Sequence, residues 1–161
     1  MADGVGGVTG FWPFLGQVTS VVCGWIVVHK LSAARDRDKA RREMVAKSAD
    51  LLSDQVGEIF LDGGKYHQGS RDLSLEVKLK LALQDLSNRT SALGSICDHS
   101  SELTACRCAV LSLKQAITKD HFEDEHLEPV CHNASQLQAI AAETMRLKQA
   151  LLKLKHSQFI E

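Results

Sequence analysis

Cysteine and histidine are the residues of this chain with the most distinctive chemistry, and several of them come in close pairs. A zinc site needs four thiolate or imidazole ligands in a tetrahedron, and these commonly arrive as closely spaced pairs. None of the pairs here has the spacing of a standard zinc motif. Side chains two residues apart on a helix also point about 200° away from each other. We therefore predict no metal ion; the residues that could still contribute to a site are Cys97, His99, Cys106, Cys108, Cys131 and His132.

The number of cysteines indicates free thiols rather than a disulfide framework. The chain has five, an odd number, and they are sparse for its length, whereas small secreted scaffolds are dense in even-numbered cysteines. We interpret them as reduced cytoplasmic thiols. Cys106 also falls on the apolar side of an expected helix, where a free cysteine acts as a small hydrophobic residue. A cysteine-based metal or redox sensor stays a further alternative.

The sequence contains no recognisable catalytic constellation. The acidic segment at 121–126 resembles a metal site only in composition, because no His-Glu-x-x-His pattern is present. There is no Gly-x-Ser-x-Gly elbow and no phosphate-binding loop, and Gly63-Gly64-Lys65 is too short to hold a phosphate. We predict a protein that is not an enzyme and that uses no cofactor and no small-molecule substrate.

Composition and charge favour a helical protein that does not bind nucleic acid. Aromatic residues make up 5% of the chain and there are only two prolines, while the second half is rich in strong helix formers. The formal net charge is -1, from 19 basic and 20 acidic residues. The basic excess of nucleic-acid-binding domains is therefore missing.

Residues 11–31 predict a transmembrane helix. From Phe11 to Val28 no residue is charged, and about 18 helical residues span roughly 27 Å. Extension to Leu31 reaches the hydrocarbon thickness of a bilayer, because Lys30 can extend its ammonium to the headgroups. A cleaved signal peptide and a buried core helix are the alternatives, although a basic n-region is missing.

The charges on the two sides of this segment predict its orientation. Residues 1–10 contain no Lys or Arg, whereas basic residues crowd the segment after Val28. The positive-inside rule then places 1–10 outside and the rest in the cytoplasm. We expect a single-pass protein of the cell (inner) membrane, with a basic neck and a membrane-proximal amphipathic helix at 32–61. In the membrane segment, Gly16, Ser20 and Gly24 recur every four residues, a pattern that allows two helices to approach closely and self-associate.

The remaining sequence predicts an all-α fold, a cytoplasmic bundle or coiled coil of three to four helices. The neck should continue into a helix that ends at Asp62-Gly63-Gly64, and the bundle should occupy 70–158 with helices near 70–93, 101–118 and 134–155. Alternating apolar residues at 73–83 also fit a strand, but the residue types favour a helix. That helix is apolar on two sides, so we place it in the middle of the bundle.

The last helix carries the clearest pattern and leads to the functional hypothesis. Its apolar residues follow a heptad seam, interrupted by the polar Thr144. We predict a membrane-anchored interaction protein that associates with itself or with an unidentified protein through such seams. A membrane-active, pore-forming or depolarising effector is the alternative. The residues expected to form the interacting seam are Leu137, Ile140, Leu147, Leu151 and Leu154.

Overall fold

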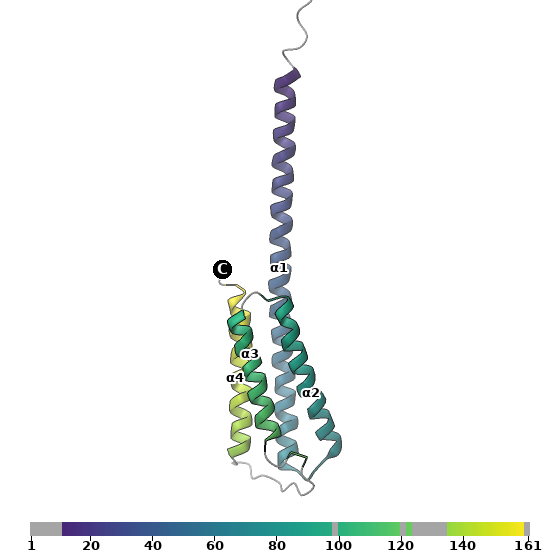
Figure 1. Cartoon of the computed structure of the whole chain (residues 1–161), viewed down its shortest axis with the longest axis vertical. Coiled ribbons are helices and arrows are strands. Elements are labelled where there is room, and N and C mark those ends of the chain that lie inside the picture. Colours follow the sequence, from purple (N-terminus) through teal and green to yellow (C-terminus); the bar gives the residue numbers. More distant parts are fainter. Residues whose placement is uncertain (1–10, 98–99, 120–121, 124–134, 160–161) are drawn as a thin grey trace, which may run out of the picture. The chain divides into compact units, whose positions relative to one another are not determined.

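The computed structural model of the chain is all-α in the residues that it describes, which are 11–97, 100–119, 122–123 and 135–159. The helices in these ranges are α1 (Phe11–Gln68), α2 (Leu73–Ala92), the 3-10 helix η1 (Leu93–Ser95), α3 (Ser100–Thr118) and α4 (Ser135–Ser157) (Figure 1). The all-α fold class and the helical bundle predicted from the sequence are confirmed. The chain divides into two compact units, residues 1–41 and 42–161.

The first unit contains the beginning of α1, where the membrane anchor is predicted. Side chains at 11–21 and 23 lie outside the described residues, and these include Gly16 and Ser20 of the predicted association stripe. Gly24 is exposed, and a Cβ added there would meet no atom within 4 Å. Within the described residues, no helix has a stretch that is long and apolar enough to cross a membrane. The transmembrane helix predicted at 11–31 is therefore not supported.

The predicted end of the membrane-proximal helix at Asp62-Gly63-Gly64 is wrong. α1 continues through both glycines to Gln68, and the amide of Gly69 then donates to the carbonyl of Lys65 at 3.0 Å. A Cβ added at Gly63 would lie 3.7 Å from the side chain of Ile117 on α3. Glycine lowers helix propensity by only about 1 kcal/mol, and packing of this turn against the bundle offsets that cost.

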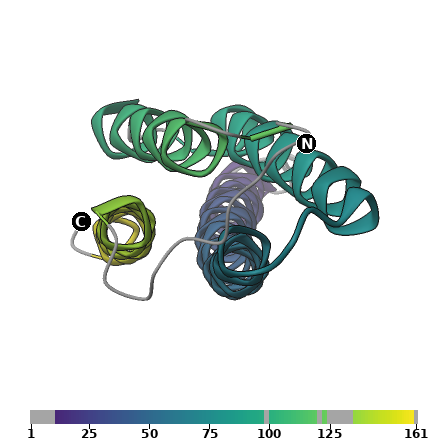
Figure 2. The same cartoon turned by 90° about the horizontal axis from the view of Figure 1, so that it is seen from below.

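The second unit is a helical bundle around one core, to which α1 contributes its part after Arg41 (Figure 2). Each helix turns one apolar face inward, so the core combines side chains from all of them. Its largest fully buried members are Leu52, Ile59 and Tyr66 from α1, Leu79, Leu83 and Leu86 from α2, Leu113 and Ile117 from α3, and Ile140, Leu147, Leu151 and Leu154 from α4.

Residues 73–83 are helical, so the alternation in this stretch is not that of a strand. The side chain of Asp72 caps α2 by accepting hydrogen bonds from the amides of Ser74 and Leu75, at 2.9 and 3.3 Å. Only one apolar side of α2 is buried. The other side, formed by Leu73, Val77 and Leu81, is 53–66% exposed. The prediction that α2 lies in the middle of the bundle is therefore wrong.

A polar and aromatic network joins the helix ends at one end of the bundle. The carboxylate of Glu76, which is buried, accepts hydrogen bonds from Lys80 at 2.9 Å and from Arg71 at 3.4 Å. The bond from Lys80 holds the pKa of Glu76 below its usual value. Lys80 also pairs with Glu123, whose amide donates to the hydroxyl of Tyr66 at 3.2 Å. α1 and α2 are thereby tied to the segment after α3.

His67 is fully buried beside this network. Its Nε2 lies 2.9 Å from the carbonyl oxygen of Ile117, so Nε2 carries the proton of the neutral ring and donates it. The amide nitrogen of Gln136 lies 3.4 Å from the same Nε2 and donates to the carbonyl of Lys119 at 3.0 Å. Nδ1 has no hydrogen-bond partner among the described residues. Burial lowers the pKa of His67, against a smaller opposing effect of the Ile117 hydrogen bond.

Two leucines of α4 provide a matched test of the core. Leu147 is fully buried, whereas Leu152 is 54% exposed on the same helix. We expect Leu147→Ala to lower the free energy of unfolding by about 2–5 kcal/mol, because it removes buried methyl groups and leaves a cavity. Leu152→Ala should change it by less than about 0.5 kcal/mol. Urea denaturation followed by circular dichroism measures both; equal losses for the two variants would contradict this core.

The buried imidazole of His67 should make stability depend on pH. Because its pKa is lowered in the folded state, the unfolded chain binds a proton first as the pH falls below about 6.5. The contribution of His67 to the free energy of unfolding is complete above that pH. Below it, this contribution declines by at most about 1.4 kcal/mol per pH unit until the pH falls below the folded-state pKa. Urea midpoints between pH 7.5 and 5 should fall more steeply for the wild type than for His67→Gln. Parallel profiles would refute the role of His67.

Candidate interaction surface on α3 and α4

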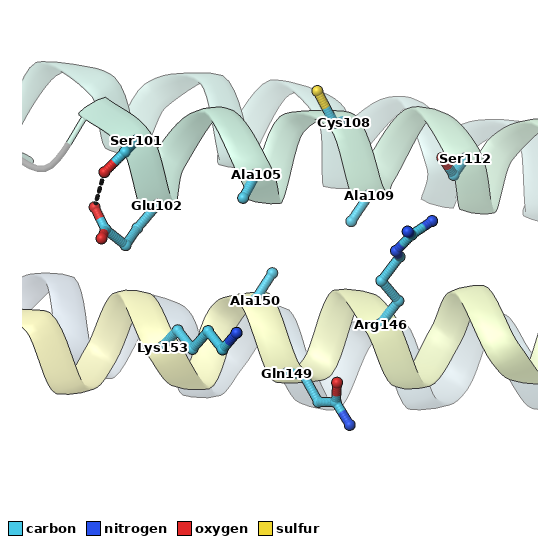
Figure 3. A pocket seen from close by; sticks show the side chains of 10 residues that line it. All are labelled: Ser101, Glu102, Ala105, Cys108, Ala109, Ser112, Arg146, Gln149, Ala150 and Lys153. Atoms are coloured by element: carbon cyan, nitrogen blue, oxygen red, sulfur yellow. Dashed lines mark hydrogen bonds between the residues drawn. The ribbon is translucent and has the colours of Figure 1, made fainter.

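A groove runs along the outside of the bundle between α3 and α4. It has a volume of about 610 Å³. The helices are antiparallel, so Ser101 and Lys153 lie at one end of the groove and Ser112 and Arg146 at the other (Figure 3). The side chains where the two helices face each other are short, namely Ala105 and Ala109 from α3 and Ala150 from α4. Small residues allow the two backbones to approach closely and leave the space above them open.

The spacing of residues explains why α3 presents only small side chains here. Ser101, Ala105, Cys108 and Ser112 are separated by four, three and four positions, which places them along one side of a helix. The larger apolar residues of α3 occupy the opposite side and fill the core. α3 therefore contributes its small-residue side to the groove and its apolar side to the core.

The two walls of the groove differ in charge. α4 contributes Arg146, Gln149 and Lys153, and α3 contributes Glu102, whose carboxylate accepts a hydrogen bond from the hydroxyl of Ser101 at 2.6 Å. The residues that line the groove include no base beside the exposed Cys108 that would activate its thiol. A shallow surface with small residues below and long polar residues at the rim is suited to holding a helix.

The structure describes three of the six residues that the sequence offers as metal ligands. Cys97 and Cys106 are buried in the core and Cys108 is exposed in the groove, while His99, Cys131 and His132 lie outside the described residues. In the described part of the chain, no three His, Cys, Asp or Glu side chains are placed to hold a metal ion. Burial raises the pKa of Cys106 to about 11, so its thiol stays protonated at neutral pH and acts as a core residue.

Only Phe122 and Glu123 of the acidic segment at 121–126 are described. The ring of Phe122 packs against that of Tyr66, with 5.0 Å between the centroids, and Lys80 lies 5.8 Å from the centre of the Phe122 ring. Glu123 has a φ of 74° and pairs with Lys80. These two residues belong to the network at the helix ends, where their contacts hold the bundle together.

The heptad seam predicted to bind a partner is placed largely inside the bundle. Ile140, Leu147, Leu151 and Leu154 belong to the core, and Leu137 is half-buried. Thr144 is also buried, and its hydroxyl has no partner among the described residues. A second molecule could reach Ile140, Leu147, Leu151 and Leu154 only by opening the bundle.

Sequence reasoning missed both the groove and the outer face of α4. The groove follows from the pairing of two helices, which no single stretch of sequence records. The outer face carries Met145 and Leu152, which are 58% and 54% exposed and seven residues apart. The sequence contains this second repeat, but the inner seam is more apolar and therefore gives the stronger heptad signal.

Comparison with protein families, with curated proteins and with solved structures finds no match for this chain.

Proposed function

We propose that this protein is a non-enzymatic interaction protein that holds a helix of a partner on the outer surface of α3 and α4. The groove with short side chains at Ala105, Ala109 and Ala150 carries this proposal. In helix-in-groove recognition, an amphipathic helix inserts its apolar side chains between two helices of its receptor. Short residues below and exposed residues at the rim provide the space and the contacts for such insertion.

The size of the groove supports a helix as the occupant. From Ser101 to Ser112 the groove follows α3 for about 16 Å at 1.5 Å per residue, which corresponds to about three turns of a docked helix. The apolar residues of the inner seam are occupied by the protein's own core. The outer surface of α3 and α4 lies outside the predicted seam and stays open to a partner, whether a second copy or another protein.

Site-specific photo-crosslinking in cells tests this proposal. A photoreactive amino acid at Gln149, which is exposed in the groove, should form a discrete covalent adduct with the bound partner. The same amino acid at Asn88, exposed on α2, is the control and should form none. Filling the groove with Ala105→Trp should abolish the adduct at Gln149, because the indole occupies the space of the docked helix.

The circular dichroism spectrum and thermal midpoint of Ala105→Trp establish that the bundle is intact, since Ala105 is exposed. Adducts that form equally at Asn88, or that persist in the folded Ala105→Trp protein, would show that the groove is not the binding surface.

We also propose that the N-terminal segment attaches this interaction domain to the inner face of the cell membrane, with residues 1–10 outside. Two observations support attachment: the uncharged sequence from Phe11 to Val28, and the exposure of Trp25, Val27 and Val28 by 55–68% in the first unit. Exposed apolar side chains gain free energy when a bilayer or another helix covers them.

Fractionation of cells tests the membrane attachment. The full chain should remain in the membrane pellet after extraction with alkaline carbonate, whereas a variant lacking residues 1–29 should be released. Gly24→Lys is a second variant that should weaken retention, because a lysine in a spanning helix opposes insertion by roughly 3 kcal/mol at mid-membrane. Release of the full chain by carbonate would refute the proposed anchor and leave the groove proposal untouched.

A further inference from the structure

The outer face of α4 carries a second row of residues at heptad spacing. We call it the outer seam; its residues are Ala142, Met145, Gln149, Leu152 and His156, all of them exposed. Their spacing alternates between three and four, which is the spacing of the a and d positions in a coiled coil. In this register Met145 and Leu152 occupy d positions, whereas Phe159, seven residues further on, lies in the turn after the end of α4 at Ser157. The core of the bundle does not require this pattern, because the inner seam on the opposite face of α4 already provides the buried residues.

The positions that flank the outer seam are basic on both sides. Arg146 and Lys153 follow the d residues, and Lys148 and Lys155 precede the a residues, so the charged e and g positions around Gln149 all carry Lys or Arg. Arg146 lies 3.5 Å from Glu143, and Lys155 lies 2.7 Å from Asp50. Within the described residues, Lys148 and Lys153 form no ion pair.

This charge pattern decides between a second copy and another protein. In a parallel pair of α4 helices, each g residue faces an e residue of the other helix, so Lys148 would face the partner copy's Lys153. In an antiparallel pair, g faces g and e faces e, and basic residues meet again. Like charges at these positions oppose pairing, whereas acidic residues on the incoming helix would form ion pairs.

The outer seam is continuous with the groove. Arg146, Gln149 and Lys153 belong to the outer seam or its flank, and they also form the α4 wall of the groove (Figure 3). A helix lying on this surface can place apolar residues against Met145 and Leu152 and acidic residues against Arg146 and Lys153. It also lies beside the small-residue side of α3.

From these observations we infer that the partner is an acidic amphipathic helix with a seven-residue apolar repeat. This inference rests on the proposed function and specifies the partner of the same surface. Gln149 and His156 occupy a positions, where polar residues fix the register of pairing at the expense of affinity. The contact is therefore selective in charge and readily reversible.

Two synthetic peptides test the charge preference. Both contain four heptads, about 28 residues, with leucine at a and d; one has glutamate at every e and g position and the other has lysine. Fluorescence anisotropy measures their binding to the full chain, purified in mild detergent. We expect the acidic peptide to bind about tenfold or more tightly than the basic one, and its binding to weaken as salt screens the ion pairs.

Charge reversal links this preference to the outer seam. The double variant Lys148→Glu/Lys153→Glu should prefer the basic peptide instead. The matched control is Lys47→Glu/Lys114→Glu, which changes the net charge equally at exposed positions outside the groove and should keep the wild-type preference. Thermal melts establish that both variants are folded. Loss of preference in both variants alike would show that net charge, and not the outer seam, selects the peptide.

The remaining outcomes separate this inference from the proposed function. If neither peptide binds, or both bind equally, while the Gln149 adduct still forms, the acidic partner is wrong and the groove proposal stands. If the adduct is also absent, both the acidic partner and the groove proposal are wrong. A homodimer at this surface, or binding to phosphatidylserine vesicles but not to phosphatidylcholine vesicles through Lys148 and Lys153, would replace the acidic helix by a second copy or by a lipid surface.

Discussion

The burial of the inner seam of α4 is the interaction on which the rest of the second unit depends. Ile140, Leu147, Leu151 and Leu154 enter a core to which α1, α2 and α3 also contribute. Once this face is buried, the orientation of α4 about its own axis is fixed. The outer seam must then point to solvent, and Arg146, Gln149 and Lys153 must line the groove beside α3. One packing choice therefore determines both the stability of the bundle and the surface that it offers.

The network at the helix ends adds polar specificity to a core that is otherwise apolar. His67 donates to a carbonyl of α3, the hydroxyl of Tyr66 accepts from the amide of Glu123, and Lys80 connects Glu76 with Glu123. Buried polar groups are costly when they have no partner, so such contacts favour one alignment of the helix ends over others. The acidic segment, which in composition resembles a metal site, contributes Phe122 and Glu123 to this alignment.

The charge of the chain as a whole conceals the character of the proposed binding surface. A net charge of -1 excludes a generally basic protein, yet basic residues flank both sides of the outer seam of α4. α4 thus has two apolar faces: one is buried in the core, and the other is exposed and lies between two rows of basic residues. In the proposed binding mode, α4 stabilises its own bundle with one set of side chains and contacts the partner with another.

By itself, the sequence determined the all-α class, the approximate limits of α2, α3 and α4, the heptad pattern of α4 and the core position of Cys106. These features follow from local periodicity and residue type, which one helix expresses without its neighbours. Tertiary structure decided the rest. Because Gly63 packs against Ile117, α1 continues past the glycines that the sequence predicts as its end. Among the described residues no helix covers the second apolar side of α2, so Leu73, Val77 and Leu81 are exposed. Both apolar faces of α4 have the same period, so only the positions of the neighbouring helices distinguish core from surface.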